Sequence, residues 1–142
     1  MNNPYEFRDF KQSTITKSDI VHLIDSAKKS TGRVYRFNLH EDYSDPLQEM
    51  LVCLLPDSPK NIHKHQDRDE VITIIEGCVK ITFFDEEHIT INEVILDRSD
   101  YSLFCRIPQN VWHQVESIKG ICVIHEVSRG PYDSTQMVRK DS

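Results

Sequence analysis

The sequence predicts an all-β domain, an antiparallel sandwich or barrel, preceded by one amphipathic helix. After Gly32 the chain consists of short β-prone segments separated by turn clusters such as Ser44-Asp45-Pro46 and Pro56-Asp57-Ser58-Pro59. Many short strands at near-regular spacing are typical of folds that close or cover their sheet edges. A parallel α/β arrangement is disfavoured, because no helical stripe follows Gly32 to supply the crossover helices it needs.

The helix is predicted to begin near Thr16 and to run for about 13 residues, a length typical of helices in globular domains. Thr16 and Asp19 have the spacing of a capping box, and Lys28 and Lys29 lie where the helix dipole favours cations. Gly32 can end the helix. The apolar residues that fall on one helical face are Ile20, Val21, Leu23, Ile24 and Ala27.

The chain therefore divides into three parts: an N-terminal extension with the helix (residues 1–32), a β barrel (residues 33–132) and a polar C-terminal tail (residues 133–142). Residues 1–15 show weak periodicity, so we expect them to be loosely ordered or used at a subunit contact. The tail from Ser134 is expected to be frayed. A chain of 142 residues has the size of a single domain.

Strands are predicted at the β-prone runs between the turns. Alternation is clearest in 78–84, where Val79, Ile81 and Phe83 share one face. In 120–127 both faces are largely apolar, which predicts a strand covered by the barrel interior and by a second subunit. The predicted strands are 33–39, 50–55, 60–65, 71–76, 78–84, 89–96, 102–107, 112–115 and 120–127.

The stretch from Ile62 to Gly77 carries the strongest functional pattern. His63 and His65 are two residues apart, so on a strand both imidazoles point to the same side. Polar residues 66–69 and then Glu70 follow, and a hairpin here would bring Glu70 back beside the two histidines. His113, after a turn that begins at Pro108, is the candidate fourth ligand. Imidazole and carboxylate ligands suit zinc, iron, nickel, manganese or cobalt.

Chance alone gives a His-x-His pair about 0.3 times in a chain with this histidine content, so the pair is weak evidence by itself. With Glu five residues later and Gly seven after that, the expectation falls to roughly one in a thousand. The alternative is a barrel that keeps these residues for packing, or a site that binds no metal. Four such groups would nevertheless be costly to bury unpaired, and a cation offsets that cost.

The pattern His63-x-His65-x4-Glu70-x6-Gly77 resembles the first motif of the cupins, and Pro108-x-Asn110-x2-His113 resembles the second. The resemblance implies a jelly-roll barrel, the double-stranded β-helix. Asn110 stands where the second motif usually has Gly, but Asn tolerates the left-handed backbone conformation that such a Gly adopts. Ser117 stands where many cupins have Asn.

Within the cupins, the chain from Arg33 to Tyr132 is similar to the WbuC family of cupin-fold metalloproteins. The supporting segments are Arg36-x-Asn38-x-His40, Gln48-Glu49-Met50 and Glu126-Val127-x2-Gly130-Pro131-Tyr132. This resemblance implies His63, His65, Glu70 and His113 as ligands of one divalent transition metal, a link to bacterial surface-polysaccharide (O-antigen) synthesis, and a homodimer. It supplies no reaction, so no residue is assigned as catalytic.

Three side chains are candidates for substrate binding. Arg36 and His40, just before the barrel, are placed to hold an anionic group at its mouth, although a structural role for Arg36 is as reasonable. His125 and Glu126 lie on opposite faces of one strand, so at most one of them points inward. The sequence does not decide between them, and His125 is carried as the third candidate.

Three functions fit this pattern. The first is a metal-dependent enzyme, isomerase-like or epimerase-like, acting on a small sugar or sugar-nucleotide. The second is an iron-dependent dioxygenase, which the same ligand set would serve. The third is a non-catalytic protein that binds a small molecule.

Composition narrows the partners and the location. The net charge is −6 and the basic residues are scattered, which works against nucleic acid as a partner. The N-terminal residues have no apolar core of signal-peptide length and no apolar run is long enough to span a membrane, so a cytoplasmic protein without membrane contact is expected. Cys53, Cys78, Cys105 and Cys122 form no Cys-x-x-Cys pair and are expected to be small buried hydrophobes.

Overall fold

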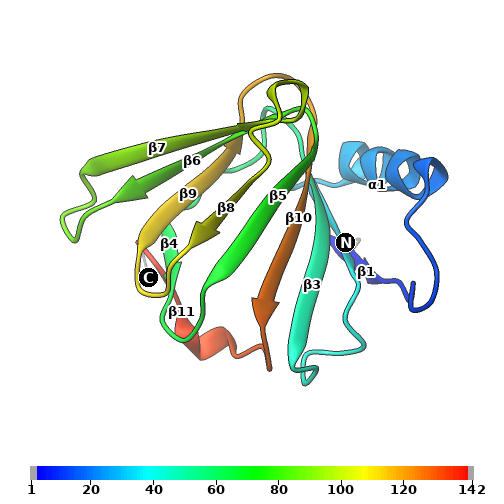
Figure 1. Ribbon diagram of the computed structural model, residues 1–142, viewed down its shortest axis with the longest axis horizontal. Coiled ribbons are helices and arrows are strands. Elements are labelled where there is room, and N and C mark those ends of the chain that lie inside the picture. The colour runs from blue at the N-terminus through cyan, green and yellow to red at the C-terminus, as the bar shows by residue number, and fades with distance from the viewer. Residues whose placement is uncertain (1–2, 141–142) are drawn as a thin grey trace.

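Two β-sheets face each other in the computed structural model, which describes residues 3–140. One helix lies outside the sheets, against β2 and β3 (Figure 1). The sheets splay apart at one end and approach at the other. This is the predicted all-β cupin barrel with one N-terminal helix.

The first sheet has the order β1-β2-β3-β10-β5-β8 among the described residues. All of its neighbouring strands are antiparallel except β1 and β2, which run parallel. Its strands are β1 (Tyr5–Phe7), β2 (Val34–Asn38), β3 (Leu47–Leu54), β10 (Cys122–Arg129), β5 (Glu70–Glu76) and β8 (Phe104–Ile107).

The second sheet has the order β11-β4-β9-β6-β7 in the same part of the chain, and its pairings are antiparallel. Two short 3-10 helices lie in the loops, η1 (Arg98–Asp100) and η2 (Ser134–Gln136). Its strands are β11 (Met137–Arg139), β4 (His63–His65), β9 (Trp112–Ser117), β6 (Cys78–Phe84) and β7 (Thr90–Asp97).

Helix α1 (Lys17–Lys29) has the start and the length that the sequence predicts, but its C-cap is Ser30 and not Gly32. The Thr16 hydroxyl accepts a hydrogen bond from the Asp19 backbone N–H, and the Asp19 carboxylate accepts one from the Thr16 N–H, which together form the capping box. Leu23 and Ala27 are fully buried against the outer face of the first sheet. The apolar partners of the helix on that face include Phe37, Leu51, Cys53 and Val123.

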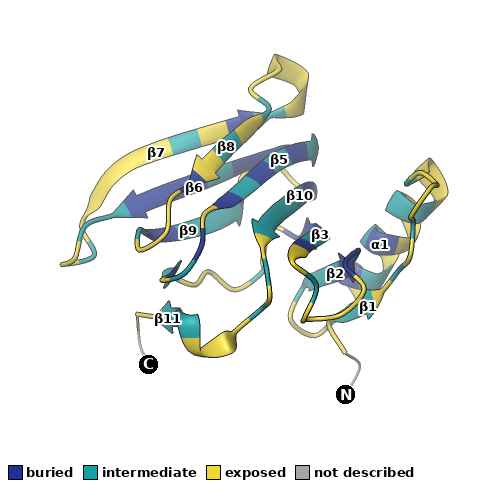
Figure 2. Cartoon of the chain, turned by 60° about the horizontal axis from the view of Figure 1, so that its bottom comes forward, coloured by how far each residue is buried: buried dark blue, intermediate teal, exposed yellow. Residues whose placement is uncertain are grey.

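A second apolar core fills one end of the space between the sheets, formed by buried residues of strands such as β5, β6 and β10 (Figure 2). Alternation divides the residues of β2 between the two layers: Phe37 faces the helix, whereas Arg36 and Asn38 face the interior cavity. On β10, Cys122 and Ile124 enter the inner core and Glu126 and Ser128 follow on the same face. The inner surface is therefore apolar at one end and polar at the other.

Two segments predicted to be loose are strands. Tyr5–Phe7 adds β1 to the edge of β2, with Tyr5 opposite Arg36. Met137–Arg139 forms β11 and pairs with β4, placing Met137 opposite His65. Both are three residues long, too short for periodicity to reveal them. Met1, Asn2, Asp141 and Ser142, which belong to the same two segments, lie outside the described residues.

The predicted hairpin between His65 and Glu70 is also wrong. Strand β4 belongs to one sheet and β5 to the other, so residues 66–69 cross between the sheets. Glu70 reaches the histidines from the opposite wall of the barrel, because residue 70 opens β5 with its side chain inward. Among the described residues, no helix is both long enough and apolar enough to cross a membrane.

Gly77 marks the tight connection between β5 and β6, and we predict that Gly77→Ala destabilises the fold more than Gly120→Ala. Both glycines have positive φ, 79° and 70°. A Cβ at Gly77 would lie 2.5 Å from the carbonyl oxygen of Ile121, whereas nothing lies within 4 Å of a Cβ at Gly120. Gly120→Ala should cost about 1–2 kcal/mol of unfolding free energy from the backbone alone. Gly77→Ala should cost about 1–3 kcal/mol more. Urea unfolding of both variants measures this, and equal losses would contradict it.

The four cysteines are free thiols, and three of them are buried as expected, whereas Cys105 is only partly buried, which corrects the expectation for that residue. Burial raises the pKa of Cys53 to about 12 and that of Cys122 to about 11, so their reactive thiolate is scarce at pH 8. We predict that Ellman's reagent modifies the partly exposed Cys105 first in the native protein and reaches all four thiols in denaturant. Cys105→Ser should remove the first phase. Equal rates for all four native thiols would contradict the burial.

Candidate metal centre

His63, His65, Glu70 and His113 converge inside the barrel. One ligand atom from each lies within 4.8 Å of those of the other three, as a group that could hold a metal ion. His63 and His113 are direct cross-strand partners on β4 and β9, with ring centroids 4.3 Å apart. His65 follows two residues later on the same face, 5.3 Å from His63 between ring centroids. The structure thus brings together all four residues predicted to be ligands.

Asn110 explains how the two motifs meet. Its φ of 62° is left-handed, as predicted for a residue that replaces glycine in this turn. The turn places its N–H 2.7 Å from the carbonyl oxygen of His65, and the Gln109 N–H donates to Asp69 at 2.9 Å. The loop before β9 is thereby tied to both ends of the 66–69 crossing.

Backbone carbonyls set the tautomers of two of the histidines. Nδ1 of His63 lies 3.0 Å from the Asn61 carbonyl, and Nδ1 of His113 lies 2.9 Å from the Val111 carbonyl. A carbonyl only accepts, so each Nδ1 carries the hydrogen and each Nε2 keeps its lone pair for the interior. Burial, with a contribution from His113, lowers the pKa of His63 to about 4, so His63 is neutral at pH 7 and able to bind a metal.

Glu70 lies between His65 and His113. Its Oε1 is 3.1 Å from Nε2 of His65 and 3.5 Å from Nε2 of His113. Burial acts to raise the pKa of Glu70, but the adjacent imidazoles of His113 and His65 outweigh it and hold the pKa well below its usual range. A buried, ionised carboxylate among imidazoles is a donor set that suits a divalent transition metal.

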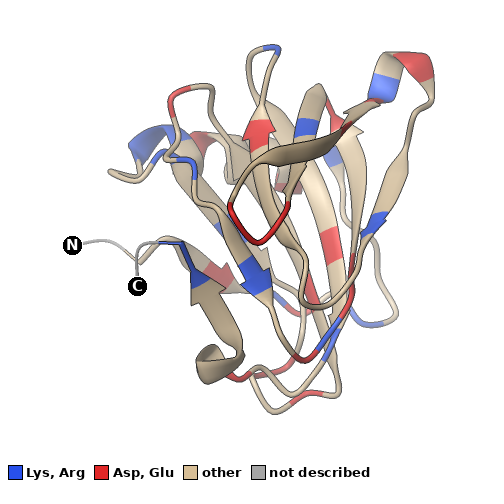
Figure 3. Cartoon of the chain, turned by 90° about the vertical axis from the view of Figure 1, so that its left-hand side faces the viewer, with Lys and Arg blue, Asp and Glu red and all other residues tan. Residues whose placement is uncertain are grey.

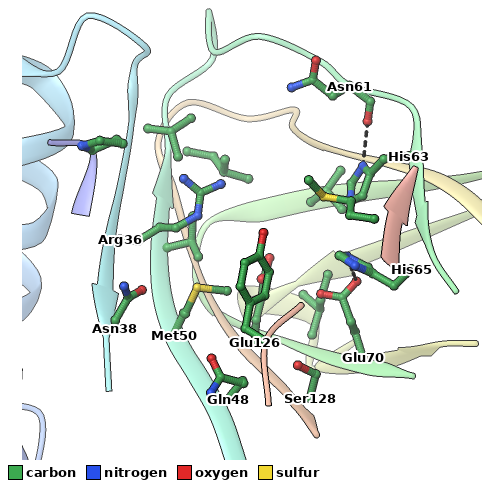
Figure 4. A pocket seen from close by; sticks show the side chains of 18 of the residues that line it. Arg36, Asn38, Gln48, Met50, Asn61, His63, His65, Glu70, Glu126 and Ser128 are labelled. Atoms are coloured by element: carbon green, nitrogen blue, oxygen red, sulfur yellow. Dashed lines mark hydrogen bonds and ion pairs between the residues drawn. The ribbon is translucent and has the colours of Figure 1, made fainter. Parts of the chain in front are cut away.

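The cluster opens into a cavity of about 520 Å³ between the two sheets (Figure 4). His63, His65 and Glu70 lie on one side of it, Arg36, Gln48 and Met50 lie on the other, and Glu126 lies between the two groups. His40 also lines the cavity and is buried, with Nδ1 at hydrogen-bond distance from the backbone of Glu49. Arg36 and His40 are thus on the wall where the sequence predicted them.

His125 is outside the cavity, which corrects its selection as a substrate-binding candidate. It points to the other face of β10, and its Nε2 lies 2.7 Å from the Glu49 carboxylate. Glu126 lines the cavity instead. Burial raises the pKa of Glu126 to about 7, and the charge of Glu70 adds to the effect while Arg36 opposes it.

Sequence reasoning missed three contributors to the cavity wall: Arg68, Tyr132 and β11, which supplies Met137 and Arg139. Arg68 is buried in the crossing between the sheets, with its guanidinium 5.1 Å from the ring centroid of Tyr132. The signal in the sequence is that Arg68 lies among the four residues between His65 and Glu70, two of the clustered residues. These four residues are interpreted as a solvated turn because the other three, Gln66, Asp67 and Asp69, are also polar.

Comparison with solved structures places the molecule among cupin-fold proteins that include metal-dependent enzymes. CapF matches with a TM-score of 0.64 at 18% identity, covering 77% of this chain and 32% of that one. Oxalate decarboxylase of Bacillus subtilis, a protein with Mn(II) centres, matches with a TM-score of 0.55 at 17% identity, covering 76% and 28%. A dTDP sugar isomerase of Desulfovibrio desulfuricans G20 matches with a TM-score of 0.54 at 19% identity, covering 64% and 62%.

The chain belongs to the family described as a domain of unknown function, DUF6016, whose model matches residues 15–96. That range includes three of the four clustered residues and ends before His113. The chain spans less than half the length of the first solved proteins that it matches. No curated protein matches it in sequence.

We predict that the four clustered residues bind the metal and that histidines outside the cluster do not contribute. Protein purified without chelator should contain close to one equivalent of transition metal per chain by elemental analysis. His63→Ala or His113→Ala should weaken binding more than about 100-fold, since losing even an outer hydrogen-bond partner of a ligand costs about 10–100-fold. His125→Ala, which alters the opposite face of β10, is the matched control and should keep the metal. Unchanged metal content in His63→Ala would show that the ligands are elsewhere.

Proposed function

We propose that this protein is a metal-dependent enzyme, isomerase-like or epimerase-like, that acts on a small sugar or sugar-nucleotide in bacterial surface-polysaccharide (O-antigen) synthesis. The observation that carries the proposal is the cluster of three imidazoles and one carboxylate at the wall of a polar cavity. A volume of about 520 Å³ is in the range of small-molecule sites and suits a sugar ring with a substituent.

The donor set leaves room for a ligand. A divalent ion held by three neutral imidazoles and one carboxylate, if octahedral, would have two positions open and would supply Lewis-acid chemistry toward a carbonyl or hydroxyl oxygen. The protein's part is to hold the ligand with its reacting carbon near a group that transfers a proton. Met50 and Ile72 provide apolar surface in the same cavity and restrict water there.

Glu126 is the candidate for proton transfer. It lies in the cavity with the cluster, on the face of β10 that also carries Ser128. Its pKa of about 7 allows it to take and return a proton near neutral pH. Isomerisation and epimerisation beside a carbonyl require such a group, whereas activation of dioxygen does not, and this favours the isomerase over the dioxygenase.

The relatives support the proposal without deciding it. One neighbour in fold is a dTDP sugar isomerase, and the sequence resembles the WbuC family in segments that line the cavity, Arg36, Asn38 and His40 among them. The homodimer, the cytoplasmic location and the absence of nucleic-acid and membrane partners stay predictions from the sequence.

The test is solvent exchange. Metal-loaded protein is incubated in D₂O with dTDP-sugars, and deuterium incorporation into the sugar ring is followed by NMR. We expect incorporation that chelator abolishes and that Glu126→Gln slows at least about 100-fold while metal content is retained. Glu93→Gln, which changes an exposed carboxylate on β7, should exchange at the rate of the unaltered protein.

Two results would replace the proposal. Oxygen consumption that depends on added ferrous iron, without deuterium incorporation, would establish the dioxygenase. Tight binding of a sugar-nucleotide with neither exchange nor oxygen consumption would establish a non-catalytic binding protein.

A further inference from the structure

Arg68 is a buried cation whose acidic neighbour, Asp133, is not in ion-pair contact with it. It is 6% exposed, and its Nε and Nη1 have no hydrogen-bond partner. No carboxylate of the described residues lies within ion-pair distance of its guanidinium, although such pairs are found at Arg8, Arg33 and Arg106. A buried charge is normally paired, because removing it from water is costly. Arg68 lines the cavity, so the missing partner is most simply a ligand.

The same wall carries other unpartnered polar atoms. Oδ1 of Asn38 and Nε2 of His40 are buried without hydrogen bonds, and both residues line the cavity. Two arginines, Arg36 and Arg68, line the cavity together with the carboxylates of Glu70 and Glu126. Elsewhere acidic and basic residues are intermixed along strands and loops (Figure 3), and the net charge is −6. In this acidic protein the arginine side of the cavity is a place that attracts anions.

The remaining contact of Arg68 links it to the metal centre. Its Nη2 lies 3.4 Å from Nδ1 of His65. Guanidinium groups only donate, so Nδ1 of His65 accepts here and the ring hydrogen is on Nε2, where it faces Glu70 at 3.1 Å. Binding a metal through Nε2 would require the lone pair of that atom, so a neutral ring would carry its hydrogen on Nδ1, where it would oppose the Arg68 donor. The hydrogen of His65 is thus on Nε2, the atom that a metal would need. In His63 and His113 the hydrogen is on Nδ1, which leaves Nε2 free for a metal.

We propose that Arg68 binds the carboxylate or phosphoryl group of the ligand beside the metal centre, and that metal loading frees Arg68 for this role. The inference deepens the proposed function by naming the substrate as an anion, and it rests on that function for the metal. The planar fork of arginine fits both oxyanions with two parallel hydrogen bonds. Tyr132 supports the guanidinium from the other side, 5.1 Å between its ring centroid and Cζ.

Three ligands that share a sugar ring provide the test: glucuronate, glucose 1-phosphate and neutral glucose. Each is titrated by calorimetry into chelator-treated and Mn²⁺-loaded protein, in buffer free of other oxyanions. We expect an anionic sugar to bind at least about 10-fold more tightly than glucose, as hydrogen bonds to charged groups imply. The carboxylate and phosphate arms identify which oxyanion is preferred. Mn²⁺ loading should strengthen binding of that anion.

The variants separate an anion-binding residue from a structural one. Arg68→Met should weaken anion binding about 10–100-fold, the loss expected when a charged hydrogen-bond pair is removed, and Arg68→Lys should restore part of it. Arg68→Met should keep its Mn²⁺ content and unfold at the same or a higher urea concentration, because an unpaired buried charge has gone. Arg106→Met, which alters an arginine side chain that is 71% exposed outside the cavity, should change nothing.

The outcomes distinguish the two proposals. Equal anion affinity in Arg68→Met and the unaltered, metal-loaded protein would overturn the inference and leave the metal-dependent function standing. Arg68-dependent anion binding in a chain that takes up no metal would uphold the anion site and overturn the metal-dependent function. Identical affinity with and without Mn²⁺ would overturn the coupling between the metal and Arg68.

Discussion

Glu70 is a carboxylate buried between two sheets, and the arrangement of the site follows from the cost of keeping it charged there. The imidazoles on either side offset that cost, and they come from the facing sheet. The β4–β9 pairing must therefore hold its register, because a one-residue slip would turn His63 and His113 to opposite faces. The left-handed turn at Asn110 and the hydrogen bond from its N–H to His65 hold that register.

The two-faced first sheet explains how a small domain contains both a core and a polar cavity. On strand β2, Phe37 faces the helix and Arg36 faces the cavity. The polar end of the inner face buries little apolar surface, and packing of α1 on the outer face makes up for this. The inner core at the other end, with Ile81 and Val79 fully buried, keeps the sheets together without help from the site. This separation allows the polar end to hold unpartnered polar atoms such as Oδ1 of Asn38 and Nε of Arg68.

Local signals in the sequence predict the fold class and the shared face of His63 and His65, whereas Glu70 and His113 join them as ligands through the resemblance to the two cupin motifs. Period-two alternation identifies the strand 78–84, and the His63-x-His65 spacing places two imidazoles on one face. Pairing between distant segments has no local signal. For that reason the sequence predicts a hairpin at residues 65–70, although these residues cross between the sheets. It also gives no sign of the three-residue strands β1 and β11. The choice between His125 and Glu126 likewise depends on the register of β10 with β5, which the sequence of β10 alone does not contain.

Strand β11 gives residues 137–139 more importance than their place in a polar tail suggests. They cover the outer edge of β4, the three-residue strand that carries His63 and His65, and they hydrogen-bond with it along its length. Without them β4 would present bare backbone N–H and C=O groups to solvent or to a neighbouring molecule. Trimming this segment by proteolysis, or fusing a bulky tag close to it, would therefore disturb the strand that bears two of the four clustered side chains.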